Sequence, residues 1–177
     1  MDLPLLVVVT GMPSSGKTTV AEGLASRLQL PLIAKDEIKE SLYESLEAED
    51  VAASSQLGAA AYALIFALAR RMLASGASLI VEANFFRDQD SEFASLPEHW
   101  TVQLHCHAPL AILLDRYANR SRHAGHRDSE KIKGLPARFE SGAHSPLALD
   151  GELIQIDTTE PVNLDALAER IRSQLRS

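Results

Sequence analysis

Near its amino-terminal end the chain reads Gly11-Met12-Pro13-Ser14-Ser15-Gly16-Lys17-Thr18. This stretch has the spacing G-x-x-x-x-G-K-[ST] of a phosphate-binding loop. Residues 5–9 before it are continuously apolar, as in a buried parallel strand, and residues 19–28 after it have helical spacing. A glycine-rich turn capped by a serine is the simpler interpretation, but such a turn would not require a lysine followed by a threonine. The stretch therefore predicts a strand, a phosphate-binding loop and a helix in succession, with a nucleoside triphosphate as the ligand.

The chemistry of phosphate binding explains the residue types in the loop. The two glycines allow backbone angles and a close approach that a side chain would block. Lys17 is expected to reach the β- and γ-phosphates as a catalytic point charge, and Thr18 to bind Mg²⁺ through its hydroxyl. The following helix presents its positive end to the anion. The ATP-binding residues predicted here are Gly11, Met12, Pro13, Ser14, Ser15, Gly16, Lys17, Thr18 and Thr19.

Length and composition indicate one soluble domain spanning residues 1–177. The net charge of -7 argues against broad affinity for polyanions, so we do not expect nucleic acid as a partner. The single cysteine, Cys106, cannot form an internal disulfide and is expected in the core. The long apolar stretch 51–73 contains polar and charged residues, which favours a packed helix over a membrane span. We therefore expect a cytoplasmic protein without membrane contact. Its oligomeric state stays open.

Apolar runs alternate with helical patterns along the whole chain. This alternation predicts an α/β fold, in which a parallel sheet is covered by helices on both faces. Ligands of such folds bind at the carboxyl ends of the strands, where the loop, Asp36 and Glu82 are all expected. The expected strands are 5–9, 30–34, 78–84, 101–105 and 153–157, and the expected helices are 19–28, 37–48, 50–74, 88–96, 109–117, 129–140 and 164–175. Gly134 and Pro136 stand in the middle of the helical pattern at 129–140.

Asp36 follows the second expected strand and is the candidate base for the acceptor hydroxyl. A positioned base at the γ-phosphate edge accelerates proton removal by roughly 10²–10⁴-fold. The alternative is a helix N-cap, for which aspartate is favoured, and one residue could do both. Lys35 beside it could bind an anionic acceptor or lie at the surface.

Glu82 ends the third expected strand, where a Walker B acid holds Mg²⁺ through water. A salt bridge or a contact with substrate are the alternatives for this carboxylate. Asn84 and Arg87 follow in a loop that could line the acceptor pocket, together with the helices of residues 37–73. Four residues of these helices could line the pocket or simply pack: Ser54, Gln56, Tyr62 and Phe66.

Basic residues gather between Arg116 and Arg138, where acidic residues are few. Cations that close over the reacting phosphates would stabilise the transferring group and exclude water. We therefore expect a basic lid at about residues 116–138, although a solvated helix face is the usual meaning of such a run. The basic residues are Arg116, Arg120, Arg122, Arg127, Lys131, Lys133 and Arg138.

Four segments together resemble small P-loop kinases of the AAA_33-type group, which includes chloramphenicol phosphotransferase-like, zeta-toxin-like and polynucleotide 5′-kinase-like proteins. They are the phosphate loop, Lys35-Asp36-Glu37-Ile38, Ile80-Val81-Glu82-Ala83-Asn84, and Leu113-Leu114-Asp115-Arg116-Tyr117 with Arg120-Ser121-Arg122. The resemblance implies a three-layer P-loop NTPase fold, whose five-stranded parallel sheet has the order 2-3-1-4-5. It also implies ATP and Mg²⁺ as cosubstrates.

The resemblance also assigns roles to residues of this chain. It implies that Asp36 activates the acceptor and that Arg120 or Arg122 acts catalytically near the transferred phosphate. Residues 158–161 would then approach the adenine, so Thr159 and Pro161 join Arg116 as predicted ATP-binding residues. Glu82 stands where many relatives have aspartate, and Lys35 stands where polynucleotide kinases have arginine. The second departure disfavours a polynucleotide acceptor.

The sequence thus predicts an ATP- and Mg²⁺-dependent kinase acting on a hydroxyl of a small molecule. Its substrate-binding residues would be Lys35, Asp36, Glu82, Asn84 and Arg87, and its metal residues Thr18 and Glu82. A nucleoside, nucleotide or 5′-polynucleotide kinase is the alternative among enzymes. A non-catalytic ATP-binding or toxin-like module that acts on a partner protein is the alternative outside them. No Asn-Lys-x-Asp base-reading motif is present, which mildly favours ATP over GTP.

Overall fold

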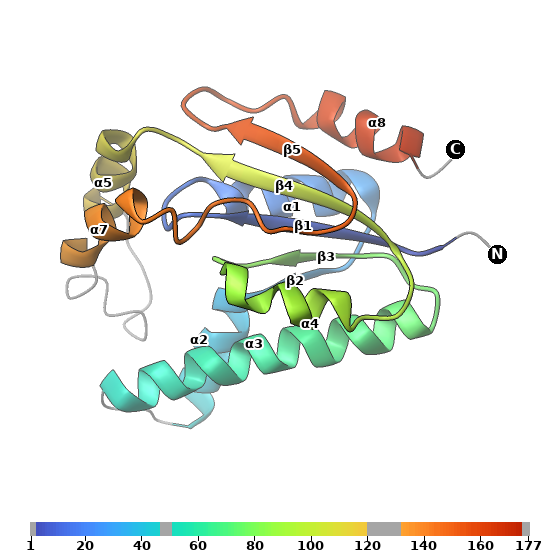
Figure 1. Ribbon diagram of the computed structural model, residues 1–177, viewed down its shortest axis with the longest axis horizontal. Helices are drawn as coiled ribbons and strands as arrows, with labels where there is room; N and C mark the ends of the chain where they lie inside the picture. Colours follow the sequence, from blue (N-terminus) through green and yellow to red (C-terminus); the bar gives the residue numbers. More distant parts are fainter. Residues whose placement is uncertain (1–2, 47–50, 120–131, 175–177) are drawn as a thin grey trace.

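The computed structural model describes residues 3–46, 51–119 and 132–174. Within them, five parallel strands form one sheet in the order β2-β3-β1-β4-β5, which confirms the expected order (Figure 1). The strands are β1 (Leu5–Gly11), β2 (Leu32–Ala34), β3 (Leu79–Glu82), β4 (Trp100–His107) and β5 (Glu152–Asp157). Their carboxyl ends meet at the left edge of the sheet in Figure 1, where α5 and α7 also lie.

Helices follow the strands as the alternation predicts. They are α1 (Lys17–Leu28), α2 (Lys35–Ser45), α3 (Val51–Ala74), α4 (Asp90–Ala94), α5 (Leu110–Asn119), α7 (Leu135–Glu140) and α8 (Leu164–Gln174). Two short 3-10 helices, η1 (Arg87–Gln89) and η3 (Ile132–Gly134), precede α4 and α7. The helical pattern at 129–140 is therefore interrupted at Gly134, and Pro136 lies in the first turn of α7, where its missing N–H costs nothing.

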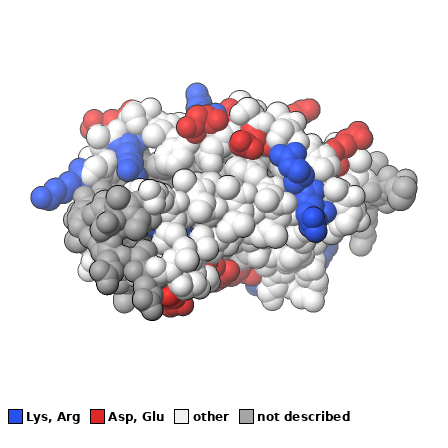
Figure 2. All heavy atoms as spheres, turned by 90° about the horizontal axis from the view of Figure 1, so that it is seen from below, with Lys and Arg blue, Asp and Glu red and all other residues white. Residues whose placement is uncertain are grey.

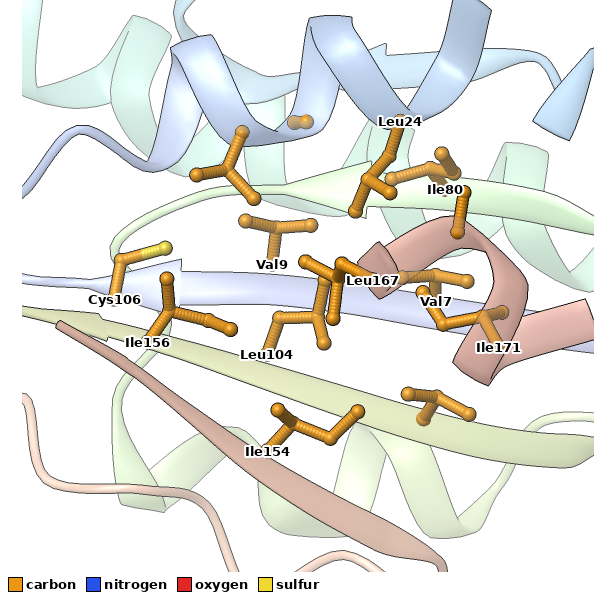
Figure 3. Packing of buried hydrophobic residues seen from close by; sticks show 14 of the residues in the cluster. Val7, Val9, Leu24, Ile80, Leu104, Cys106, Ile154, Ile156, Leu167 and Ile171 are labelled. Atoms are coloured by element: carbon orange, nitrogen blue, oxygen red, sulfur yellow. The ribbon is translucent and has the colours of Figure 1, made fainter. Parts of the chain in front are cut away.

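Strand β1 is buried on both faces because its side chains alternate between two cores. Leu5, Val7 and Val9 point to the side covered by α1 and α8, where Leu24 and Ile171 pack against them (Figure 3). Cys106 lies in this core, as expected, and its burial raises the pKa of its thiol to about 12. A strand buried on both faces reads as a continuous apolar run, which is what residues 5–9 show.

The other side chains of β1 face α3 and α4. Leu6 and Val8 pack there with Ile65 and Phe66 of α3 and with Phe93 of α4. The segment between α7 and β5 completes this layer through Leu147. With its amide suitably oriented, Gln103 of β4 donates to the Leu147 carbonyl at 3.1 Å and accepts from its N–H at 2.8 Å. This double contact holds the segment against the sheet.

Within the described residues, one helix segment, Ser54–Ala74 of α3, is long and apolar enough to cross a membrane, with a mean hydropathy of 1.5. Its apolar side chains divide between two faces, because Ile65 and Ala69 are buried while Leu64 and Leu68 are exposed. Figure 2, which views the molecule from below, shows a broad surface with few charged side chains on this side. The buried face that contains Ile65 and Ala69 is typical of a helix that packs on a sheet.

The start of α2 differs from one expectation. Ala34 is the N-cap residue, and Asp36 lies within the first turn. The interpretation of Asp36 as an N-cap is therefore wrong, although its negative charge at this position still favours the helix.

Candidate active site

The phosphate loop is held in a conformation that its glycines make possible. Gly11 has φ 148°, and a Cβ at this residue would lie 2.2 Å from the carbonyl oxygen of Cys106 on the neighbouring strand. Gly16 has φ 77° and a Cβ there would lie 3.4 Å from Cβ of Thr158. Ser14 also takes a positive φ of 64°, which is uncommon for a residue with a side chain. The loop thus packs closely between β4 and the segment that follows β5.

The loop offers polar groups to a ligand. The side-chain oxygens of Ser14 and Ser15 are buried, and within the described part of the chain neither has a hydrogen-bond partner. Helix α1 begins directly after Gly16, with no side-chain cap and no acidic residue in its first turn. Its first N–H groups and its positive end therefore suit an anion at this position.

Lys17, Thr18 and Glu82 converge beside the loop. Lys17 Nζ lies 3.8 Å from Glu82 Oε1 and donates to the Met12 carbonyl at 3.5 Å. The Thr18 hydroxyl donates to Glu82 Oε2 at 3.4 Å. Glu82 is only 2% exposed, so its charge is placed deep in the site. The two residues predicted to hold Mg²⁺ are thus in direct contact.

The start of α2 brings a second set of polar residues to the same edge. Ala34 of β2 lies beside Glu82 of β3 in the sheet, and Asp36 follows two residues after Ala34. Lys35 Nζ lies 3.2 Å from Asp36 Oδ1 and 5.7 Å from the ring centroid of Tyr62. The Tyr62 hydroxyl donates to the carbonyl oxygen of Asn84 at 2.8 Å.

Tyr62 lies between the start of α2 and the loop after β3. Burial raises the pKa of its hydroxyl well above the usual value, and the charges of Asp36, Glu82 and Asp88 add to that rise. The phenol is therefore a neutral hydrogen-bond donor at physiological pH. Its position, with its ring near Lys35 and its hydroxyl on the Asn84 backbone, places Tyr62 at the site rather than only in the core.

The sequence also left undecided whether Ser54, Gln56 and Phe66 line the acceptor pocket, and their positions differ from that of Tyr62. Phe66 belongs to the core, with its ring centroid 5.0 Å from that of Phe93. Gln56 is exposed. Ser54 is buried and accepts a hydrogen bond of 2.8 Å from Nζ of Lys39, a lysine that is only 3% exposed. Lys39 was missed in the sequence, although it lies three residues after Asp36, on the same face of a helix.

A separate cavity of about 540 Å³ opens on the α1 side of the loop. It brings together five residues predicted to bind ATP from distant parts of the sequence. The lining residues include Gly16, Thr19, Arg116, Thr159 and Pro161. Its size and its contact with the phosphate loop fit the nucleoside of ATP, whose phosphates would then extend toward Lys17.

Arg116 forms one wall of this cavity and is fixed in place. Its guanidinium donates to the Thr158 hydroxyl at 3.2 Å and to the Thr158 carbonyl at 2.6 Å. The Thr158 hydroxyl in turn donates to the His107 carbonyl at 3.1 Å. The first residue of the predicted lid is therefore tied to the segment after β5. Arg120, Arg122, Arg127 and Lys131 lie outside the described residues. Arg87 is exposed at the start of η1.

Two histidines near the loop were not identified as site residues from the sequence. His105 of β4 and His144, in the segment after α7, both line a smaller cavity next to Met12. Burial lowers the pKa of each to about 4, so both rings are neutral at pH 7. No sequence pattern marks them, because they are brought together only by the sheet and the return of the chain over it.

Comparison with known proteins agrees with this architecture. The AAA_33 family model, described as an AAA domain, matches residues 6–141. The crystal structure of a "putative kinase" from Chloroflexus aurantiacus J-10-fl is 34% identical, with a TM-score of 0.89, and the match covers 99% of this chain and 98% of that one. A search of curated proteins found no match.

Two more distant structures share the fold. A sugar kinase from Janibacter sp. HTCC2649 is 21% identical with a TM-score of 0.60, over 98% of this chain and 94% of that one. A shikimate kinase from Bacteroides thetaiotaomicron is 15% identical with a TM-score of 0.55, over 98% and 99% of the two chains. The family match spans most of the chain and includes the phosphate loop, Asp36 and Glu82. The chain is a P-loop domain of the AAA_33 family.

Proposed function

We propose that the protein is an ATP- and Mg²⁺-dependent kinase that transfers the γ-phosphate to a hydroxyl of a small molecule. The observation that carries this proposal is the convergence of Lys17, Thr18 and Glu82 beside the phosphate loop, with Asp36 following the adjacent strand. The described relatives support it, since they include a "putative kinase", a sugar kinase and a shikimate kinase.

ATP would lie across the carboxyl ends of the strands. The nucleoside would occupy the 540 Å³ cavity, between Arg116 and the segment of Thr159 and Pro161. Its phosphates would lie in the loop of Gly11–Thr18, held by backbone N–H groups and by the hydroxyls of Ser14 and Ser15. Lys17 would then bind the β- and γ-phosphates and leave its present contact with Glu82.

The residues present fit a magnesium ion. A threonine hydroxyl and a buried carboxylate 3.4 Å apart are oxygen donors of the kind that Mg²⁺ takes beside a nucleotide. Thr18 would bind the ion directly, and Glu82 would hold it through water. The ion's chemical contribution is to neutralise charge on the β- and γ-phosphates.

In the proposed reaction, Asp36 accepts the proton of the acceptor hydroxyl. The acceptor oxygen forms a bond to the γ-phosphorus as the bond between that phosphorus and the β–γ bridging oxygen breaks, and ADP leaves with the bridging oxygen. Lys17 stabilises the charge that develops on the phosphates, and Arg120 or Arg122 would do so from the lid. Lys35, Tyr62, Asn84 and Arg87 would surround the acceptor.

The test is transfer of labelled γ-phosphate from ATP to a panel of sugars, sugar acids, aminoglycosides, phenicols, nucleosides and a 5′-hydroxyl oligonucleotide. The Asp36→Asn variant keeps the size of the side chain but removes the base. We expect its turnover to fall by at least ~100-fold while its ATP affinity stays nearly unchanged. A variant as active as the wild type would exclude Asp36 as the base. Binding of ATP without transfer to any acceptor would favour a regulatory module instead.

A further inference from the structure

The smaller cavity, next to Met12, has a largely apolar lining that includes several polar groups which phosphate binding does not use. It has a volume of about 150 Å³ and lies among the end of β4, helix α7 and the segment between α7 and β5. Among its lining residues are Met12, His105, Arg138 and His144. Since the Met12 carbonyl accepts from Lys17, the cavity shares a wall with the place where the γ-phosphate would lie.

Its two imidazoles are buried and have hydrogen-bonding capacity to spare. His105 is 9% exposed and His144 is 4% exposed. Among the residues that the structure describes, Nδ1 of His105 and both ring nitrogens of His144 lack a partner of good hydrogen-bond geometry, although the Phe85 backbone interacts with the His144 ring. A buried polar atom without a partner costs free energy, so these atoms are expected to meet a ligand or ordered water.

The histidines are held rigidly. The His144 ring lies 4.6 Å from that of Phe86, centroid to centroid, and Phe86 belongs to the loop that also contains Asn84 and Arg87. The segment carrying His144 is fixed to the sheet by the contacts of Gln103 with Leu147. His105 is anchored in β4 beside Thr10 of β1. The cavity is thus preformed beside the phosphate loop, and its His144 ring contacts the predicted acceptor loop at Phe86.

The charge state of the rings indicates the chemistry of the ligand. Burial, followed by the positive charges of Arg138 and Lys17, keeps the pKa of His144 near 4, against the opposing effect of the Phe85 carbonyl. Burial and the neighbouring His107 do the same for His105. A neutral imidazole offers one donor and one acceptor, which is what a hydroxyl group requires. The volume equals that of about five water molecules, enough for a short polyol fragment.

We propose that His105 and His144 form a subsite for the hydroxyl-bearing end of a polyhydroxylated acceptor, whose other end receives the phosphate. This inference rests on the proposed function, and it narrows the acceptor to a polyol or sugar-type compound. Phenicols and other acceptors with apolar ends would leave both imidazoles without partners and are disfavoured.

The test measures acceptor binding separately from catalysis. The full chain is labelled with ¹⁵N-histidine, loaded with a non-hydrolysable ATP analogue and Mg²⁺, and titrated with ribitol, gluconate or propanoate. Ribitol carries hydroxyls and no charge. Gluconate carries hydroxyls and a carboxylate, and propanoate carries a carboxylate without hydroxyls. We expect the imidazole signals of His105 and His144 to shift with both polyols and not with propanoate. If the imidazole signals shift with propanoate and gluconate but not with ribitol, the hydroxyl subsite is wrong, and the cavity is an anion site that uses Arg138.

His144→Phe removes the hydrogen bonds but keeps a ring against Phe86. We expect it to weaken binding of the responsive polyol by at least ~10-fold, with ATP affinity and kcat at saturating acceptor changed by less than ~3-fold. His144→Gln should restore part of the affinity, and His99→Phe, outside this cavity, should leave it unchanged. One outcome would overturn the subsite alone. In it, a polyol is phosphorylated, neither imidazole signal shifts, and His144→Phe has the wild-type KM for that polyol. The proposed kinase activity would then be retained. Imidazole shifts without phosphate transfer would instead overturn the kinase.

Discussion

Lys17 and Glu82 form an ion pair that stability alone does not explain. Both side chains are more than nine-tenths buried, at 7% and 2% exposure, and their charged atoms are 3.8 Å apart. Removing two charges from water is expensive, and a buried pair often contributes no more stability than apolar residues of the same size. The pair is therefore best understood through its chemistry. On the proposed function, Glu82 would balance the charge of Lys17 until the phosphates of ATP take its place.

Replacing Glu82 by Gln tests this interpretation. The variant keeps the size of the side chain and an oxygen for Thr18 but removes the charge that would hold Mg²⁺ through water. We expect the Mg²⁺ concentration for half-maximal phosphate transfer to rise by ~10-fold or more. A magnesium titration at saturating ATP measures it. An unchanged magnesium requirement would rule out Glu82 as a metal residue.

Gly11 is the residue whose substitution should most disturb the loop. A Cβ there would lie 2.2 Å from the Cys106 carbonyl oxygen, and the backbone φ of 148° is strained for any other residue. We expect Gly11→Ala to lower the free energy of unfolding by at least ~2 kcal/mol, from strain and overpacking together. Thermal unfolding measures the loss.

Gly58 provides the matched control for that substitution. It lies inside α3, and a Cβ there would meet nothing within 4 Å. Gly58→Ala should therefore stabilise the protein by ~0.5–1 kcal/mol, because alanine loses less conformational entropy in a helix. Equal effects of the two substitutions would contradict this account of the loop.

Among the secondary-structure elements, α2 and α3 form the side of the candidate site away from the 540 Å³ cavity. Helix α3 presents Ile65 to the sheet and Tyr62 to the site, because these residues lie three positions apart on neighbouring parts of one face. Helix α2 starts directly after β2, which places Asp36 in its first turn. One pair of elements therefore supplies both core packing and candidate acceptor contacts.

Two adjacent residues of α3 distinguish a packed helix from a lipid-facing one. Ile65 is 0% exposed, whereas Leu64 is 41% exposed. We expect Ile65→Ala to lower the free energy of unfolding by ~2–5 kcal/mol, through lost burial and the cavity left behind. Leu64→Ala should change it by less than ~0.5 kcal/mol in aqueous buffer. Urea unfolding of both variants makes the comparison. A large cost at Leu64 would mean that its face is covered in solution.

At the scale of the whole molecule, the fold buries two neutral histidines and so makes its stability depend on pH. The pKa values of His105 and His144 fall from 6.5 to about 4 on folding. Between pH 6.5 and 4 the unfolded chain therefore binds more protons than the folded one. Stability is fully present above pH 6.5 and is lost as the pH falls toward 4.

The size of this loss can be measured by urea unfolding at pH 7, 5.5 and 4.5. We expect the free energy of unfolding to fall on the order of 1–3 kcal/mol for each ring over this range. The groups that face His144 with positive charge, Arg138 and Lys17, act in the same direction as burial. His144→Phe should show a smaller dependence on pH than the wild type. An equal dependence in both proteins would assign the effect to other groups.

The local pattern of the sequence determined most of the fold. Residues 5–9 could be read as a buried strand because a strand covered on both faces is apolar at every position. Cys106 could be placed in the core for the same reason. The phosphate loop was predicted because its function requires particular residue types at fixed spacing, and Asp36 and Glu82 were found because each follows an expected strand. The order of the strands came from the resemblance to a family, since periodicity does not specify which strands pair.

Only the tertiary structure decided which residues share a site. Tyr62 is a neighbour of Lys35 and Asn84 because α3 packs beside the ends of β2 and β3. Lys39 is buried because α2 packs against α3, and Ala34 rather than Asp36 caps α2. His105 and His144 are far apart in the chain and carry no motif. They meet because the segment after α7 returns over β4. A sequence records local preferences and chemical spacing, whereas a cavity is formed by long-range packing that no single stretch contains.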